Sequence, residues 1–279
     1  MPVKVVTDSV ADLPPQVVEE LGITVIPLNV RFGEKVYRDG IDLTTEQFYQ
    51  ELTSSKTMPV TSVPSPAAFS TAYDKLAEET DEILTVILSS KLSGTYDVAV
   101  QSIGLMKREC RVEVIDSEWA VMAQGFLVIA AARAAQDGAR LNEIMRIIRR
   151  NIPRVDMRAA FDTLEYLRRG GRIGAAQALL GAALKINPVI TMKDGLVEPA
   201  GRTRSRAKAV EHLYQFVAGY RNIDELAVEE AACSEDADAL VDRLGNIFPR
   251  ERIYRTRTTP VIGTHTGPGL LLVAVMGDK

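Results

Sequence analysis

Residues 83–103 of this chain read ILTVILSSKLSGTYDVAVQSI, an apolar run that breaks into hydroxyl groups before a helical pattern begins. The run from Ile83 to Leu88 has the length and the β-branched content of a buried strand. Ser93 stands just before apolar residues at helical spacing, so we expect Ser93 to cap a helix there. A strand that leads directly into a helix is the repeating unit of α/β folds.

The same turn is a candidate ligand site. A helix N-terminus offers unpaired backbone N–H donors and the positive end of the helix dipole, which suit a carboxylate or a phosphate. The candidate residues are Ser93, Gly94 and Thr95. The alternative is that Ser93 only caps the helix, which is the commonest role of a serine at this position.

The order of a strand followed by a helix recurs along the first half of the chain. Strand-like runs are found at Val3–Thr7, Thr24–Val30 and Cys110–Ile115, and a helical pattern follows each of them. This order predicts a mostly parallel sheet with helices on both faces, a three-layer α/β/α arrangement. Ligands of such sheets bind beyond the carboxyl ends of the strands, where Thr7-Asp8-Ser9 and Asp116-Ser117 also stand.

Local signals mark where several helices begin. We expect Asp12 to cap a first helix that Pro14 helps to open, and Thr44 has a glutamine three residues later, the capping-box spacing. Ser65 precedes a proline and is expected to cap a third helix. The alanine-rich segment Ala120–Gln136 is predicted to be a buried helix.

The pattern changes near Pro153, and we predict two domains, at residues 1–155 and 156–279. In the second domain Asp194-Gly195 separates two strand-like runs, a strong hairpin signal that introduces antiparallel pairing. We therefore predict an α/β domain with a mixed sheet. Its further elements are expected as helices at 205–220 and 237–248 and strands at 226–232, 252–254, 261–264 and 270–276.

Composition limits the class of protein. With 279 residues and 46% hydrophobic content the chain can bury two domain-sized cores, and a net charge of −4 gives no reason to expect nucleic acid as a partner. Cys110 and Cys233 are far apart, so neither a zinc site nor a disulfide framework is indicated, and a reducing cytoplasm fits best. The chain starts in a strand-like run without a leader, and no window reaches the ~18 apolar residues of a spanning helix.

Arginines cluster in two short segments of the second half. Arg168, Arg169 and Arg172 surround a double glycine, and Arg202 and Arg204 alternate near the end of the expected hairpin. The planar guanidinium matches both phosphate and carboxylate, so these residues are candidates for phosphate binding or for contact with an acidic partner. The alternative is a solvated basic face.

The remaining candidates carry hydroxyl and imidazole groups. Thr61 and Ser62 lie in an expected loop, Lys56–Pro66, and have no local capping role, so they are free to contact a ligand. His265 stands in Gly263–Gly269, an expected loop whose glycines permit close backbone approach. No acidic or cysteine partners accompany it at ligand spacing, so no metal site is predicted. No motif for nucleotide binding or nucleophilic catalysis is found.

Together, five ordered segments resemble the DegV family of fatty-acid-binding proteins, the lipid-carrying subunits of bacterial fatty acid kinase. They are Thr7-Asp8-Ser9 with Asp12-Leu13-Pro14, then Thr61-Ser62-Val63-Pro64-Ser65-Pro66, Ser89-Ser90-Lys91-Leu92-Ser93-Gly94-Thr95-Tyr96, Leu164–Ile173, and His265-Thr266-Gly267-Pro268-Gly269. The resemblance runs from Val3 to the C-terminus in the family's order.

The resemblance implies one long-chain fatty acid, of the palmitate, stearate or oleate class, held between two domains. Its carboxylate would contact Thr61 and Ser93, with His265 close by, and its tail would lie in an apolar tunnel. It also implies that the chain is not itself an enzyme. It would present the acid to a separate ATP-dependent kinase that makes the acyl phosphate for phospholipid metabolism, with transient contact to a membrane surface.

A different class of function stays open at this point. The same frame could be an enzyme that acts on a small polar substrate, with phosphotransfer or hydrolytic chemistry carried out by His265 and the arginine clusters. A co-purifying fatty acid favours the first interpretation, and unaided turnover of nucleotide favours the second.

Overall fold

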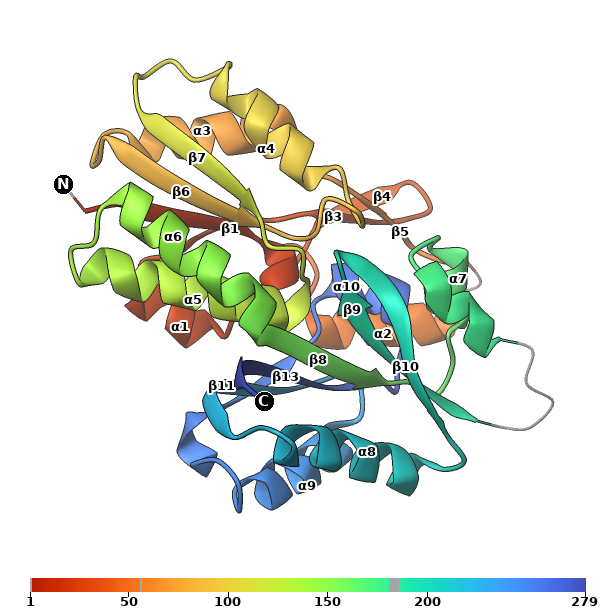
Figure 1. Cartoon of the computed structure of the whole chain (residues 1–279). Helices are drawn as coiled ribbons and strands as arrows, with labels where there is room; N and C mark the ends of the chain where they lie inside the picture. Colours follow the sequence, from red (N-terminus) through yellow and green to blue (C-terminus); the bar gives the residue numbers. More distant parts are fainter. Residues whose placement is uncertain (1, 56, 181–185) are drawn as a thin grey trace.

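The computed structural model describes residues 2–55, 57–180 and 186–279, and its elements are stacked in five layers (Figure 1). The first sheet has the strand order β2-β1-β6-β7, and all of its pairs are parallel, as the recurring strand-to-helix order predicts. Its strands are β1 (Lys4–Asp8), β2 (Thr24–Ile26), β6 (Glu82–Ile87) and β7 (Arg111–Asp116).

Helices cover both faces of this parallel sheet. The outer face carries α3 (Pro66–Leu76) and α4 (Thr95–Ile103), and the other face carries α5 (Val121–Gln136) and α6 (Leu141–Asn151) (Figure 1). The short α1 (Pro15–Glu20) follows the turn η1 (Ser9–Ala11). The predicted three-layer α/β/α arrangement is therefore confirmed.

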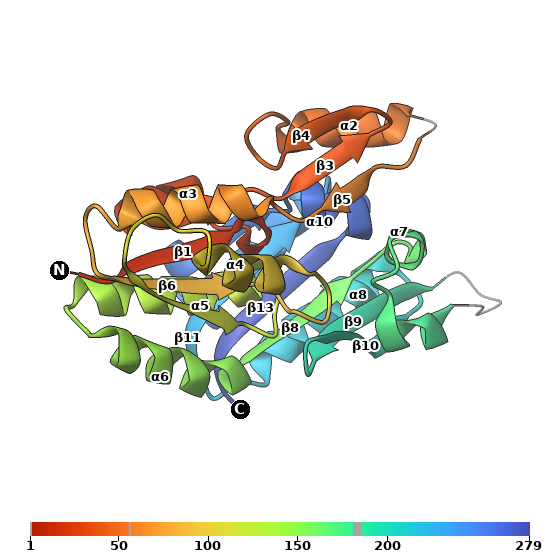
Figure 2. The same ribbon diagram turned by 90° about the horizontal axis from the view of Figure 1, so that it is seen from above.

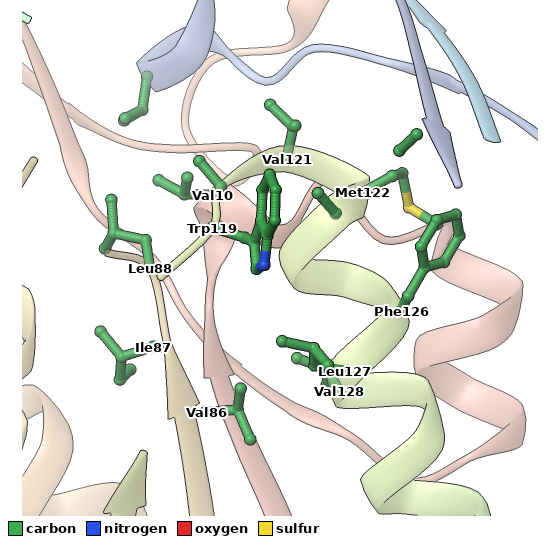
Figure 3. Packing of buried hydrophobic residues seen from close by; sticks show 14 of the residues in the cluster. Val10, Val86, Ile87, Leu88, Trp119, Val121, Met122, Phe126, Leu127 and Val128 are labelled. Carbon is green, nitrogen blue, oxygen red and sulfur yellow. The ribbon is translucent and has the colours of Figure 1, made fainter. Parts of the chain in front are cut away.

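Helix α5 is the middle layer of the molecule. It packs against β1 and β6 on one side and against the second sheet on the other, and 12 of its 16 residues are buried. Its small and apolar side chains allow this, because a helix with apolar residues all round must be covered on every side. Figure 3 shows Val10 and Leu88, which follow strands β1 and β6, gathered with Trp119 and Val121 at the start of α5.

The second sheet has six strands in the order β10-β9-β8-β13-β11-β12, and only its β11–β12 pair is parallel. The strands are β8 (Val155–Ala160), β9 (Asn187–Lys193), β10 (Leu196–Thr203), β11 (Asn222–Glu230), β12 (Ile253–Arg257) and β13 (Leu271–Asp278). Helices α8 (Arg206–Ala218) and α9 (Ser234–Leu244) cover the face opposite to α5 (Figure 1). The mixed sheet is as predicted. The exact division into two domains stays a prediction.

The predicted hairpin is present and its turn has the expected chemistry. Strands β9 and β10 pair antiparallel from Asn187 with Thr203 to Lys193 with Leu196. Asp194 and Gly195 both have positive φ, 50° and 79°, which is the conformation that a two-residue type I′ turn requires.

A third, small sheet is the main departure from the sequence prediction. It has the order β4-β3-β5 and stands to one side of the molecule beside α2 (Thr45–Ser54) and α10 (Pro260–Thr266) (Figure 2). Its strands are β3 (Asn29–Phe32), β4 (Lys35–Arg38) and β5 (Val60–Ser62). The prediction of one strand over Thr24–Val30 is wrong. Pro27 has no N–H for a ladder, and the chain changes sheets there.

This small sheet also changes the assignment of the expected loop Lys56–Pro66. Val60, Thr61 and Ser62 form β5, so the two candidate hydroxyl groups lie on a strand, while Lys56 is outside the described residues. Successive side chains of a strand point to opposite faces. Thr61 is partly buried and Ser62 is exposed.

The capping predictions have mixed outcomes. Thr44 forms the predicted capping box and Ser65 accepts from the backbone N–H of Ala68, so these two are confirmed. Asp12 does not cap α1, because it has left-handed backbone at φ 47° and Pro14 occupies the capping position. Ser93 is not in the capping position of α4 either, since Gly94 holds it.

The predicted strand at 261–264 is wrong, since these residues belong to α10. Pro260 begins this helix, and Gly263 lies against Phe48 and Tyr49 of α2, where a side chain would collide. The β-branched residues favour a strand by local propensity. The packing of Gly263 against α2 outweighs this propensity, and the segment is helical. His265 consequently lies in the last helical turn and not in the following glycine loop.

Candidate ligand cavity

A cavity opens between the carboxyl ends of the parallel strands and the inner face of the six-stranded sheet. It measures about 790 Å³, counting the part that is open to solvent. Val10 and Leu88, which follow β1 and β6, form one wall, and Met157, Ile190 and Met192 of β8 and β9 form another. The position beyond the parallel strand ends is where the sequence analysis places a ligand.

The lining is mostly apolar. Of its 22 residues, 17 are Ala, Val, Leu, Ile, Met or Phe, and together they could enclose a hydrocarbon chain: Val10, Leu28, Leu88, Leu92, Ala120, Val121, Met157, Ala159, Phe161, Leu167, Ile190, Met192, Val197, Val261, Ile262, Leu270 and Leu272. Such a lining with a few placed polar groups is typical of small-molecule sites.

The polar residues of the cavity come from four separate parts of the chain. Thr61 lies on β5, Ser93 precedes α4, and His265 and Thr266 end α10, while Arg172 completes the set. The Thr61 Oγ1 atom lies 2.9 Å from His265 Nε2. The fold therefore brings together Thr61, Ser93 and His265, three residues that the sequence singled out separately.

His265 is neutral in this environment. Burial and, to a smaller extent, the positive charge of Arg172 together lower its pKa to about 4. Its Nδ1 atom is buried without a hydrogen-bond partner in the described residues. The ring is placed by Gly170, since any side chain at Gly170 would overlap Nδ1.

The helix-start residues have distinct positions. Ser93 Oγ lies 2.9 Å from Thr95 Oγ1 and accepts a weaker bond, 3.3 Å long, from the Thr95 backbone N–H. Thr95 is buried and does not line the cavity, so it holds the Ser93 hydroxyl in place. Gly94 is exposed at the start of α4 and, like Ser62, is not part of the lining.

The arginines divide into two kinds. Arg172 lies at the cavity opening, where its guanidinium donates to the backbone oxygens of Leu92 and Gly170. Arg168 and Arg169 form ion pairs with Glu165 of their own short helix α7 (Glu165–Arg169) and line no part of the cavity.

The hairpin arginines stand apart from the lining. Arg202 donates to the backbone oxygen of Ala178 in η3 (Gly174–Leu179), and Arg204 is exposed beyond the end of β10. A role of the five arginines in binding phosphate or an acidic partner stays a prediction.

Sequence reasoning missed the supporting glycines. Gly170 lies against His265, and Gly267 lies against the ring of Tyr166 in α7, so α7 and α10 approach closely through these two residues. The double glycine at 170–171 is visible in the sequence, but a glycine pair does not by itself indicate which side chain packs against it.

Two other findings bear on the class of site. Across the ranges that the structure describes, no three His, Cys, Asp or Glu side chains gather as they would around a metal ion. No helix in these same ranges is long and apolar enough to cross a bilayer.

Comparison with known proteins identifies the family. The family model described as "Uncharacterised protein, DegV family" matches residues 2–278. The chain belongs to the DegV family. A DegV domain-containing protein of Streptomyces coelicolor is 39% identical over 279 residues, which is 98% of each chain.

Solved DegV structures share the whole fold. A DegV family protein from Thermus thermophilus, described in terms of its fatty acid binding, is 33% identical with a TM-score of 0.91, and the match covers 99% of this chain and 100% of that one. DegV of Bacillus subtilis, described as a fatty acid binding protein, is 30% identical with a TM-score of 0.90 and 99% coverage of both chains.

Proposed function

We propose that this DegV family member binds one long-chain fatty acid, with its tail in the apolar cavity and its carboxylate at Thr61, Ser93 and His265. The observation that carries the proposal is the lining itself: 17 apolar residues meet a small group of hydroxyl and imidazole groups in one cavity. The relatives from Thermus thermophilus and Bacillus subtilis, which are described as binding fatty acids, support the same ligand class here.

The polar groups suit a carboxylate. The hydroxyl groups of Thr61 and Ser93 can each donate to an anionic oxygen, and hydrogen bonds to charged groups are the stronger ones. Helix α4 begins beside Ser93, with Gly94 at its capping position, and the positive end of its dipole favours an anion there, although the N–H of Thr95 is already donated to Ser93 Oγ. The exposed Ser62 contributes less under this proposal, because it faces away from the cavity that Thr61 lines.

The proposal extends to a partner. Because the sequence has no nucleotide-binding motif, a separate ATP-dependent kinase would convert the bound acid to the acyl phosphate for phospholipid metabolism. Under this proposal Arg172, which lines the cavity, and the exposed Arg202 would contact an acidic kinase surface or the new phosphate. The protein would exchange fatty acid with a membrane surface by transient contact.

Native mass spectrometry of the purified protein tests the binding function. We expect a mass increase that matches one long-chain fatty acid, and extraction should identify it. Shortening an added acid from sixteen to eight carbons should weaken binding by several orders of magnitude, at about 0.8 kcal/mol per buried CH₂. Two results would contradict the proposal. One is a protein that is purified without lipid and binds the sixteen-carbon and eight-carbon acids equally well, and the other is a protein that turns over nucleotide without a partner.

A further inference from the structure

Four carboxyl groups are buried directly behind the cavity wall, and the proposed ligand site does not use them. Asp8 and Asp12 flank η1, Asp39 follows β4, and Glu229 is near the end of β11. None of these residues is more than 4% exposed, and none lines the cavity. Buried carboxyl groups are costly unless they are hydrogen-bonded or keep a proton, so their presence needs a reason.

Asp8 and Asp39 bind the backbone of the cavity wall. Asp8 accepts from the backbone N–H groups of Val10 and Leu88, both at 2.9 Å. Asp39 accepts from the backbone N–H of Val261 at 3.0 Å, and it accepts from Ser9 Oγ, which in turn accepts from the N–H of Leu28. The four backbone groups held in this way all belong to cavity-lining residues: Val10, Leu28, Leu88 and Val261.

Asp12 and Glu229 accept hydrogen bonds from the neighbouring backbone, and their side chains lie within hydrogen-bonding reach of each other. Asp12 Oδ1 accepts from the N–H of Thr259, which precedes α10, and Glu229 Oε2 accepts from the N–H of Met122. Met122 follows Val121, a lining residue with left-handed backbone at φ 55°. The other oxygens, Asp12 Oδ2 and Glu229 Oε1, have no donor among the described residues.

We propose that Asp12 and Glu229 share one proton between their free oxygens, and that this pair positions the cavity wall at Met122 and Thr259. Two buried carboxylates in contact cannot both be ionised, whereas a single shared proton makes one of them a donor to the other. The pair also joins the turn after β1 to the six-stranded sheet, so it ties together the two halves that enclose the cavity.

The surrounding groups favour retention of the proton. Burial and the neighbouring Glu229 raise the pKa of Asp12, and Asp39 adds to this, while burial and the adjacent Glu230 raise the pKa of Glu229. The nearby cations Arg255 and Arg257 form their ion pairs with Glu230. From α2, Tyr49 faces the pair as a neutral phenol whose pKa burial raises.

The sign of the pH effect follows from these raised pKa values. Unfolded carboxyl groups release their protons near pH 4, whereas the folded pair keeps one at higher pH. The stabilising contribution is therefore present at acid pH and is lost as pH rises through the folded pKa. In that range the unfolding equilibrium constant increases about tenfold per pH unit for each retained proton. Asp8 and Asp39, whose burial raises their pKa values to about 6, contribute little above pH 7.

The test compares the protein with Asp12→Asn and with Glu229→Gln between pH 7 and pH 8.5. Each amide keeps the accepting oxygen and supplies a fixed donor in place of the shared proton. We expect the unfolding equilibrium constant of the wild type to rise with pH, up to about tenfold per unit, and both variants to lose that dependence. Asp42→Asn is the matched control, because Asp42 is exposed, is paired with Arg38 and should keep the wild-type profile.

Fatty-acid affinity is the second measurement, and this part rests on the proposed function. Affinity of the wild type should fall with rising pH in parallel with stability, and affinity of Asp12→Asn should stay flat. Carboxyl ¹³C titration of the wild type should show one of the two groups still protonated at pH 7. Equal pH profiles for wild type and variants, two folded-state pKa values below 6, or failure of both amide variants to fold would overturn the inference. A protein that never binds fatty acid but shows the predicted stability profile refutes only the proposed function.

Discussion

At the scale of single residues, the head-group site depends on hydroxyl groups that come from different elements. Thr61 Oγ1 contacts His265, and Ser93 Oγ contacts Thr95, so each hydroxyl already has a neighbour that orients it. We expect Thr61→Ala and Ser93→Ala each to reduce fatty-acid affinity about tenfold or more, because each removes a bond to a charged group worth about 1.5–3 kcal/mol. Isothermal titration measures the effect.

Ser90→Ala is the control for this prediction, since Ser90 is exposed in the same loop as Ser93 and does not line the cavity. Its affinity should equal that of the wild type. If both site variants bind fatty acid with wild-type affinity, the carboxylate must lie in another part of the cavity.

His265 gives a prediction in pH. Because its pKa in the folded ligand-free protein is lowered to about 4, the unfolded chain takes up a proton near pH 6.5 while the folded protein does not. The stability that this neutral residue contributes is complete above pH 6.5 and is lost as pH falls from there towards 4. We expect the His265 ring signal in NMR to stay in its neutral position at pH 5.5. A midpoint near 6.5 would show that the imidazole is solvated.

Substitution of His265 tests the same lowered pKa through the pH dependence of protein stability. His265→Gln should keep a side chain of similar reach while abolishing the titration, so its stability should fall less than that of the wild type between pH 6.5 and pH 4.5. His212, the other histidine, is common to both proteins and cancels in the comparison.

At the scale of elements, the β9–β10 hairpin is fastened to the loop that carries Ser93. Ser89 Oγ donates to the Gly195 backbone oxygen at 2.7 Å, and a Cβ on Gly195 would lie 2.6 Å from the same Oγ atom. Gly195→Ala should destabilise the protein by about 1–2 kcal/mol for its left-handed backbone and by about 1–3 kcal/mol more for overpacking. Denaturant unfolding measures the loss.

Gly138→Ala separates the two causes. Gly138 has a similar positive φ of 85°, but no atom lies within 4 Å of the position of its Cβ. This variant should show the backbone cost alone. If both substitutions are equally destabilising, then the contact between Ser89 and Gly195 does not stabilise the turn of the hairpin.

At the scale of the whole molecule, the cavity opening and the arginines around it bear on the proposed kinase partner. Arg202→Ala should leave fatty-acid affinity intact, because Arg202 is exposed and outside the lining, and should sharply reduce acyl-phosphate formation with a kinase present. Added salt should mimic part of the loss, since the Debye length falls to about 8 Å at physiological ionic strength.

Arg172→Ala should reduce kinase turnover as well, with its fatty-acid affinity measured separately because Arg172 lies at the opening. Arg250→Ala is the matched control, an exposed arginine that pairs with Asp242 on another face of the molecule. If Arg172→Ala and Arg202→Ala both support normal kinase turnover at low and moderate salt, these arginines form only a solvated basic surface.

Sequence by itself determined the features that depend on local periodicity and turn chemistry. The strand-to-helix order predicts the parallel sheet, and the apolar, alanine-rich pattern predicts the buried helix α5. The pair Asp194-Gly195 predicts the hairpin. Each follows from residues that are close together in the chain, because turn dihedrals and side-chain periodicity are local properties. The five ordered segments also indicate the family, because they are contiguous motifs that can be recognised without any knowledge of contacts.

Only the tertiary structure decided the rest. Val261, Ile262 and Thr264 have β-branched side chains, yet residues 261–264 form a helix in which Gly263 packs against α2. Thr61 and His265 are 204 residues apart, and their contact exists only because β5 and α10 meet beside the cavity. The sequence predicts Asp12 to be a helix cap and gives no particular signal at Glu229. Their burial against each other, which raises both pKa values, results from the packing of two halves of the chain, and no local pattern encodes it.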